Sequence, residues 1–253
     1  MEGNSMRYEE LEDDFVNTGV GRVHCKMHDG GGVKIVFLHG FAANTRTWAN
    51  LVPLLPDSLG IYLLDLLGHG KSDAPERAYS IAVHGRAVAE FIERKRISDA
   101  YLFGNSYGGW IAARLAQGDY SGGGIMLESP AGLREMFEEW EREGSMDEHK
   151  ERLKELGSAH NIKKHVVEGS KEDFENWESY LTKESLAGIT KPAEIIWGSD
   201  DDMLDAKYAD VFSGYINGSV LRMIDGAGHM PHNTTPEAVR DAIVEFVRLK
   251  DHG

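Results

Sequence analysis

The stretch Ala100-Tyr-Leu-Phe-Gly-Asn-Ser-Tyr-Gly-Gly-Trp110 decides the fold of this chain. It begins as a short apolar run and passes into an Ala-rich helical segment, so Ser106 stands between a predicted strand and a predicted helix. Gly104 and Gly108 flank the serine and allow a turn so tight that the serine takes a strained backbone conformation. Such a turn points the Ser106 hydroxyl into a cleft at a helix N-terminus, whose free N–H groups favour a developing oxyanion.

Short apolar runs of the same kind recur along the chain, with helical patterns between them. This repeated order predicts an α/β fold, in which a mostly parallel twisted sheet carries helices on both faces. The alternating segment 20–27 and the Gly-rich turn after it predict a hairpin with 33–38 at the edge of the sheet. The apolar runs are 61–64, 100–103, 124–127, 193–197 and 220–224. The helical patterns cover 81–95, 110–117 and the segment that opens at Thr235.

The stretch 131–191 breaks this alternation, because it shows helical patterns and no convincing strand. We interpret it as a small helical cap, or lid, inserted into a core domain formed by 15–130 and 192–253. A second small domain is the alternative, but the stretch is short and highly charged, which favours a lid packed on the core. The acidic segment 1–14 is interpreted as an N-terminal tail outside the fold.

Composition limits the partners of the chain. It has 253 residues, 41% of them hydrophobic, which suits one large domain with a sizeable core. The net charge of −15 repels phosphate backbones and anionic lipid, so we expect no nucleic-acid and no membrane partner. No apolar run approaches the roughly 18–20 residues of a membrane span, and the N-terminus does not resemble a signal peptide. The single cysteine, Cys25, permits no intrachain disulfide, which suits the cytoplasm. As partners we expect a small-molecule substrate and at most a second copy, in a monomer or homodimer.

A serine hydroxyl needs a general base, and histidine, which titrates near neutral pH, suits this role. His229 ends the Gly-rich loop Asp225-Gly-Ala-Gly-His229 after the last predicted strand. A loop at the carboxyl end of a strand can reach across to Ser106, so His229 is the predicted base and His232 the alternative. Both histidines could begin a metal site, but no further ligand cluster accompanies them, and we predict no metal.

The base in turn needs a carboxylate that holds its tautomer and stabilises the imidazolium. Asp200, Asp201 and Asp202 follow a predicted strand and lie between the serine and the histidine in the chain. Three adjacent carboxylates cannot all face one imidazole, and their mutual repulsion turns some of them toward solvent. The pattern leaves the choice among the three open, and Glu128, at the end of the strand before the lid, is a weaker alternative.

The oxyanion formed during attack on a carbonyl needs two hydrogen-bond donors. One is expected to be the backbone N–H of Tyr107, directly after the serine. The other is expected in the loop after the strand that ends Phe37-Leu-His-Gly40, where the N–H of Phe41 is our prediction and that of Ala42 the alternative. Gly40 allows close backbone approach there, and it would do the same if this segment were only the exit from a strand.

Together these motifs resemble those of the α/β-hydrolase superfamily over nearly the whole chain. The resemblance implies an α/β-hydrolase fold, a Ser–Asp–His triad and no cofactor. In that superfamily the acid usually sits four residues after the tryptophan of a Trp-Gly motif, which selects Asp201. The matching motifs are His39-Gly-Phe41, Asp65-Leu-Leu-Gly-His-Gly-Lys-Ser72, Gly104-Asn-Ser-Tyr-Gly-Gly109, Trp197-Gly-Ser-Asp-Asp201 and Gly226-Ala-Gly-His229.

Within the superfamily, the chain is most similar to small lidded serine carboxylesterases and carbon–carbon bond hydrolases. The first group implies hydrolysis of a carboxylic ester of a small apolar or aromatic substrate through an acyl-enzyme on Ser106. The second implies cleavage of a vinylogous diketone, for whose carboxylate Arg114, Lys163 and Lys164 are candidate partners. A slow-turnover ligand-binding receptor with the same triad is a further alternative, as is an acyltransferase or perhydrolase.

The predicted lid is expected to set specificity. Its apolar and aromatic side chains are expected either to line an acyl pocket or to hold the lid helices to the core. These residues are Met136, Phe137, Trp140, Trp177 and Tyr180, joined by Met230 beside the predicted base.

Overall fold

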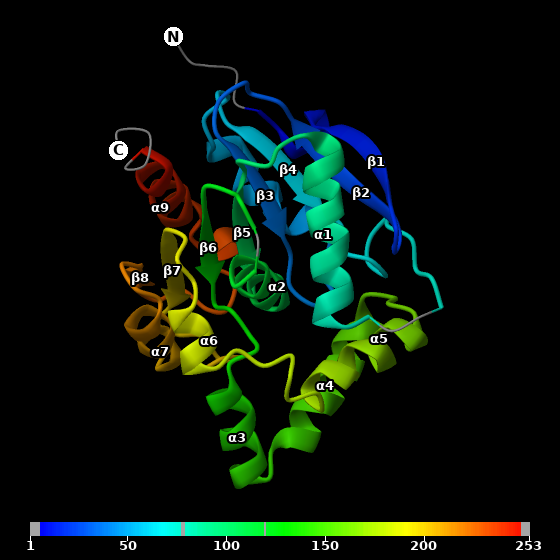
Figure 1. The fold of residues 1–253 in the computed structure, drawn as a ribbon, viewed down its shortest axis with the longest axis vertical. Coiled ribbons are helices and arrows are strands. Elements are labelled where there is room, and N and C mark those ends of the chain that lie inside the picture. The colour runs from blue at the N-terminus through cyan, green and yellow to red at the C-terminus, as the bar shows by residue number, and fades with distance from the viewer. Residues whose placement is uncertain (1–5, 77–78, 119, 249–253) are drawn as a thin grey trace.

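A computed structural model describes residues 6–76, 79–118 and 120–248 and shows one eight-stranded sheet (Figure 1). The strand order is β1-β2-β4-β3-β5-β6-β7-β8, in which β1 and β2 run antiparallel to their neighbours and the other pairs are parallel. The strands are β1 (Glu12–Thr18), β2 (Gly21–His28), β3 (Lys34–Leu38), β4 (Gly60–Leu64), β5 (Tyr101–Asn105), β6 (Gly124–Glu128), β7 (Ala193–Gly198) and β8 (Val220–Ile224).

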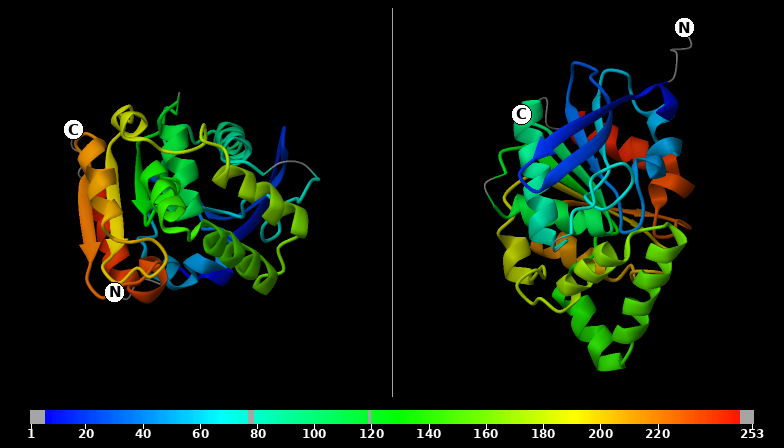
Figure 2. Two further views of the ribbon diagram at one scale, coloured as in Figure 1. Left: turned by 90° about the horizontal axis from the view of Figure 1, so that it is seen from below. Right: turned by 90° about the vertical axis from the view of Figure 1, so that its right-hand side faces the viewer.

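Helices cover both faces of this sheet, as the alternation predicts (Figures 1 and 2). One apolar cluster joins the sheet to α1 (Ile81–Lys95), α2 (Tyr107–Ala116) and α7 (Tyr208–Tyr215). A second cluster, on the opposite face, joins it to α9 (Pro236–Arg248) and to the 3-10 helices η2 (Thr45–Asn50) and η3 (Val52–Leu54). The remaining short elements of the core are η1 (Tyr8–Glu10) and α8 (Pro231–Thr234). No helix in the described ranges is long and apolar enough to cross a membrane.

Between β6 and β7 the chain leaves the sheet and forms helices at one end of the molecule (Figures 1 and 2). The two ends of this excursion meet, because Leu181 N donates to Gly132 O at 2.7 Å and Arg134 N donates to Leu181 O at 2.8 Å. The elements are α3 (Arg134–Glu143), α4 (Met146–Ala159), α5 (Lys164–Lys171), η4 (Glu172–Phe174) and α6 (Lys183–Ala187). We call this helical excursion, at one end of the molecule, the lid (Figures 1 and 2).

The edge hairpin predicted between 20–27 and 33–38 is wrong. Strand β2 pairs instead with β1, through a tight turn that sets Thr18 opposite Gly21, and with β4 on its other side. Strand β3 lies between β4 and β5, inside the sheet. The physical reason is burial, since four of the five residues of β3 are fully enclosed and a strand that is apolar on both faces belongs in the interior.

The predicted tail 1–14 is wrong for its described part. Met6, Tyr8 and Leu11 are buried against the second apolar cluster, and β1 begins at Glu12. Residues 1–5 of that segment lie outside the described ranges. Of the acidic residues in the described part of this segment, Glu12 and Asp13 are exposed on β1, and Asp13 pairs with Lys26 and Lys71, so the charge pattern concealed a strand.

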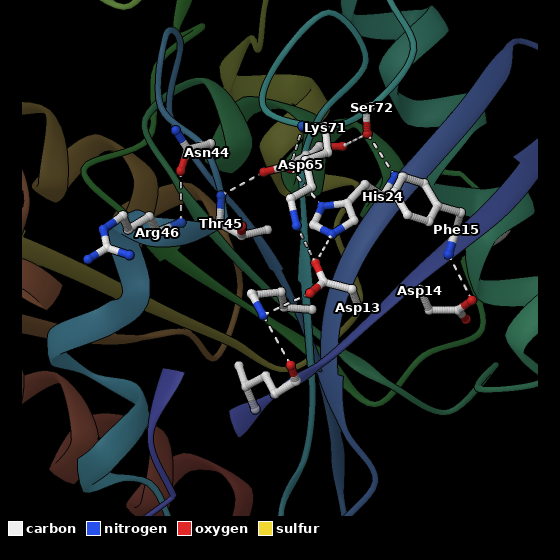
Figure 3. Close-up of polar contacts among 12 residues, drawn as sticks. Asp13, Asp14, Phe15, His24, Asn44, Thr45, Arg46, Asp65, Lys71 and Ser72 are labelled. Carbon is white, nitrogen blue, oxygen red and sulfur yellow. Dashed lines mark hydrogen bonds and ion pairs between the residues drawn. The ribbon is translucent and has the colours of Figure 1, made fainter. Parts of the chain in front are cut away.

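The Asp65 motif ties the sheet edge to the loops beside the site (Figure 3). The Asp65 carboxylate accepts hydrogen bonds from the backbone N–H groups of Thr45 at 2.7 Å and Lys71 at 2.8 Å. His24 of β2 bridges Asp65 and Asp13, with ring nitrogens 2.7 and 2.6 Å from the two carboxylates. Burial lowers the pKa of His24, but the two carboxylates outweigh it and raise that pKa above its ordinary value. The motif therefore has a structural role.

Candidate active site

Ser106 lies on a sharp turn between β5 and α2 and has a backbone φ of 53° and ψ of −114°. These angles are strained for a residue with a side chain. Close packing holds the turn: a Cβ on Gly104 would lie 2.4 Å from the carbonyl oxygen of Gly108, and one on Gly108 would lie 2.1 Å from that of Leu38. The glycine spacing in the sequence is therefore a requirement of this turn, and the serine stands at the N-terminus of α2.

His229 and Asp201 come from the loops that follow β8 and β7, and they meet at the carboxyl end of the sheet. The two oxygens of Asp201 lie 2.9 and 3.1 Å from His229 Nδ1. The backbone N–H groups of Met203 and Leu204 donate to the same carboxylate, at 2.9 and 3.0 Å. Burial raises the pKa of Asp201, but the hydrogen bond and charge of His229 and these two N–H groups bring it below its ordinary value.

The alternatives to this pair are placed elsewhere. Asp200 and Asp202 are exposed, and Asp200 accepts a hydrogen bond from the hydroxyl of Ser199. Glu128 and His232 bind each other instead, with 2.5 Å between Oε2 and Nδ1. Neither of these two lines the cavity beside Ser106. Among the described residues, no group of three or more His, Cys, Asp or Glu side chains could hold a metal ion.

Ser106 and His229 line one cavity, together with Phe41 and Tyr107. Since Nδ1 of His229 is engaged by Asp201, Nε2 is the ring atom left for the serine. No hydrogen bond joins Ser106 to His229 within the described chain; such contacts often tighten only when a substrate is bound.

The predicted oxyanion donors lie at the same cavity. Phe41 and Tyr107 both line it, and their rings meet edge to face at 6.2 Å. In the described part of the chain, neither backbone N–H has a hydrogen-bond acceptor. His39, just before this loop, is buried, donates from Nδ1 to Gly40 O at 2.7 Å and accepts the N–H of Leu66 at 3.0 Å. His39 therefore supports the loop and does not face a substrate.

The cavity lies between the core and the lid and is open to solvent; its empty space, the open part included, is about 640 Å³. Its wall is mostly apolar, which suits an acyl chain or an aromatic group. The core supplies Phe41, Ser106, Tyr107, Trp110, Met203, Leu204 and His229. The segment between β6 and β7 supplies Ala131, Trp140, His149, Arg152, Leu153, Leu156, Ser170 and Phe174.

Of the predicted pocket residues, only Trp140 lines this cavity. Met136 is fully buried, and Phe137 stacks on Tyr180 with ring centroids 4.1 Å apart. Trp177 and Met230 are 56% and 40% exposed. The pocket-lining prediction is wrong for these residues, and Met136, Phe137 and Tyr180 instead pack into the first apolar cluster, which is the alternative that the sequence left open. Composition identified the aromatic side chains but could not tell which face of each helix meets the core. The sequence analysis missed Leu153 and Leu156. They are three positions apart and so share one face of α4, a spacing that the sequence shows.

Asp173 joins the lid to the core and was missed entirely. Its carboxylate is fully buried and accepts the backbone N–H of Ile81, the first residue of α1, at 3.0 Å. It also accepts the hydroxyl of Tyr107 at 2.9 Å. An anion is favourable at a helix N-terminus, but burial dominates and raises the pKa of Asp173 to about 6. Nothing in the sequence pattern relates residues 81, 107 and 173.

Replacing Asp173 with asparagine should change how stability depends on pH. Because its pKa is about 6 in the folded state and ordinarily 3.8, the folded protein holds this proton more tightly than the unfolded chain. The stabilisation is therefore complete below pH 3.8 and lost as the pH rises toward about 6, a change on the order of 3 kcal/mol. Urea unfolding between pH 4 and pH 7 should show that Asp173→Asn lacks this decline.

The matched control for that measurement is Asp147→Asn, which alters an exposed carboxylate on lid helix α4. Its unfolding free energy should follow the wild-type pH dependence. If the Asp173→Asn curve also runs parallel to wild type across this range, Asp173 does not titrate as inferred.

Comparisons with known proteins agree with this architecture. The sequence profile of the alpha/beta hydrolase family matches residues 35–242. Monoacylglycerol lipase ABHD6 of Mus musculus is 25% identical over 286 residues, covering 97% of this chain and 83% of that protein. Among solved structures, a membrane phospholipase A described as a bacterial virulence factor has a TM-score of 0.77 at 21% identity, covering 96% of this chain and 87% of the other.

The enol-lactonase from Burkholderia xenovorans LB400 is similar in the same way, with a TM-score of 0.75 at 18% identity and coverage of 93% and 100%. At such identities the solved structures establish a shared fold. The family profile, in contrast, spans β3 to α9 and includes the segments that carry Ser106, Asp201 and His229. This chain belongs to the alpha/beta hydrolase family.

Proposed function

We propose that the protein is a serine hydrolase that cleaves carboxylic esters with an apolar or aromatic acyl group, through an acyl-enzyme on Ser106. One observation carries the proposal: Ser106 on its strained turn and His229, whose Nδ1 is hydrogen-bonded to Asp201, line the same apolar cavity. A nucleophile and a base at one cavity, with an acid behind the base that orients it, support acyl transfer.

In the proposed reaction, the Ser106 hydroxyl attacks the ester carbonyl while Nε2 of His229 takes its proton. Asp201 holds Nδ1 of His229 and stabilises the imidazolium. The N–H groups of Phe41 and Tyr107 bind the oxyanion, and its collapse expels the alcohol, which receives the proton from His229. Water then loses a proton to His229 and attacks the acyl carbonyl. The second tetrahedral intermediate collapses, which releases the acid, and His229 gives the proton to the leaving Ser106 oxygen.

The cavity wall supports an uncharged acyl group. Of the cations that a carbon–carbon bond hydrolase was expected to use, Arg114 donates to Gln117 outside the cavity, and Lys163 and Lys164 do not line it. Arg152 does line the cavity, although it is exposed, so a substrate carboxylate must be tested directly. The relatives named as a monoacylglycerol lipase, a phospholipase A and an enol-lactonase also favour the ester class.

A series of p-nitrophenyl esters of graded acyl length tests this function. We expect kcat/KM to rise by about 4-fold per methylene until the cavity is filled, because each buried CH₂ contributes about 0.8 kcal/mol. Leu156→Trp narrows the cavity and should move the optimum to shorter acyl chains. An anionic succinyl ester should be a poor substrate. Faster turnover of a ring-fission diketone than of any ester would replace this proposal with carbon–carbon bond cleavage.

A further inference from the structure

A second acid–imidazole pair lies behind the proposed triad, completely enclosed. Glu128, at the end of β6, and His232, in α8, are both 0% exposed. The Glu128 carboxylate accepts two hydrogen bonds from His232, one from Nδ1 at 2.5 Å and one from the backbone N–H at 2.9 Å. The Glu128 carboxylate therefore fixes both the backbone and the ring of His232.

The surroundings of His232 fix the ring further. Its Nε2 lies 2.8 Å from the hydroxyl of Thr47, and Trp48 packs against the ring with centroids 4.2 Å apart. Both ring nitrogens are therefore engaged, and neither Glu128 nor His232 lines the cavity. This pair cannot reach a substrate, so any effect that it has on the reaction must act through other residues.

The pair is connected to both proposed reacting residues, directly to Ser106 and through Asn105 to His229. The carbonyl oxygen of Glu128 accepts the N–H of Ser106 at 2.9 Å. His232 stands three positions after His229, in the short helix α8 that follows the base loop. The side chain of Asn105 lies between His229 and Glu128, with Nδ2 3.2 Å from His229 O and 3.4 Å from Glu128 O. Glu128 is therefore fixed to the nucleophile by its backbone and to the base loop by its carboxylate.

We infer that Glu128 and His232 are positioning residues, which set the distance between the Ser106 hydroxyl and the His229 ring. The inference rests on the proposed function, because it assigns the pair a role in that reaction. It also gives a reason for burying a carboxylate and an imidazole here: replacing a buried pair by apolar residues often costs little stability, so the presence of this pair points to another requirement. The requirement is placement, since a displacement of about 1 Å of a reacting group can cost about 10²-fold in rate.

The test compares variants of the pair by steady-state kinetics on a p-nitrophenyl ester. Glu128→Ala and the double variant Glu128→Leu/His232→Phe should each lower kcat by about 10²-fold with KM within about 3-fold, because the cavity is intact and only the approach of base to nucleophile is lost. The double variant fills the same space with apolar groups, so it should remain folded even if Glu128→Ala does not.

Two further variants test whether kcat depends on the placement of the reacting groups, on the charge of Glu128, or only on the loss of a buried carboxylate. Glu128→Gln keeps an acceptor for the His232 N–H and can donate to Nδ1, so it should retain kcat within about 5-fold. Glu194→Ala removes a different buried carboxylate, which pairs with Arg222 at 2.7 Å at the opposite end of the neighbouring strand, and should leave kcat unchanged. A loss in Glu128→Gln as large as in Glu128→Ala would show that charge matters and would overturn the inference.

The outcomes also distinguish this inference from the proposed function. If wild-type protein turns over the ester and is labelled by a fluorophosphonate at Ser106, while the folded double variant keeps kcat within 3-fold, the positioning role is wrong and the function stands. If wild-type protein is neither labelled nor active, the proposed function itself fails. Adding His232→Phe to Glu128→Ala should lower kcat little further, since the effects of residues that act as one unit are not additive.

Discussion

Ser106→Ala is expected to lower kcat for the best ester by roughly 10⁶-fold, the largest effect of any single substitution in this chain. The variant cannot form the acyl-enzyme, and water must then attack the ester without covalent catalysis. The fold should survive, because alanine has no bulkier Cβ than serine at the φ of 53° and the Ser106 side chain makes no hydrogen bond within the described chain. The unfolding free energy should stay within about 1 kcal/mol of wild type.

Covalent labelling with a fluorophosphonate tests whether Ser106 is the nucleophile without the need for a substrate. A fluorophosphonate should add its mass once to wild-type protein, at Ser106, and should fail to add to Ser106→Ala. Ser121→Ala, at an exposed serine before β6, should label like wild type. A variant without the Ser106 hydroxyl that still hydrolyses the ester at the wild-type rate would place the nucleophile elsewhere.

The nucleophile turn could be predicted from sequence because its determinants are local. Gly104 and Gly108 are required by contacts within a few residues of Ser106 and with the adjacent strand, so the requirement is visible in one short stretch. The parallel sheet could be predicted for a similar reason, since strands buried on both faces read as continuous apolar runs. Strand β1 was missed because its solvent face is acidic and only Val16 is buried along it.

Contacts that depend on tertiary structure could not be read in this way. The pairing of Glu128 with His232 spans 104 positions, and the contact of Asp173 with Tyr107 spans 66. The sequence shows that each of these residues is titratable, but no periodic pattern indicates which partner it contacts. The sequence offered both members of the first pair as alternative triad members, and the structure explains why: they form an acid–imidazole pair of their own.

The second large effect is expected for Asp201→Asn, which should lower kcat by about 10⁴-fold with KM nearly unchanged. The asparagine oxygen can still accept the N–H groups of Met203 and Leu204, so the loop should keep its shape. The amide cannot stabilise a positive charge on His229, and its NH₂ group favours the wrong tautomer of the ring when it faces Nδ1. Geometry would be preserved while the chemistry is lost.

The neighbouring aspartates provide the matched controls. Asp200→Asn and Asp202→Asn remove the same charge from exposed side chains within one residue of Asp201, so each should change kcat by less than about 3-fold. Measuring all three in the same buffer separates the specific contact with His229 from the general field of this acidic loop, which the three substitutions alter almost equally. Equal losses in all three variants would mean that the field acts on the reaction, and Asp201 would then not be the orienting acid.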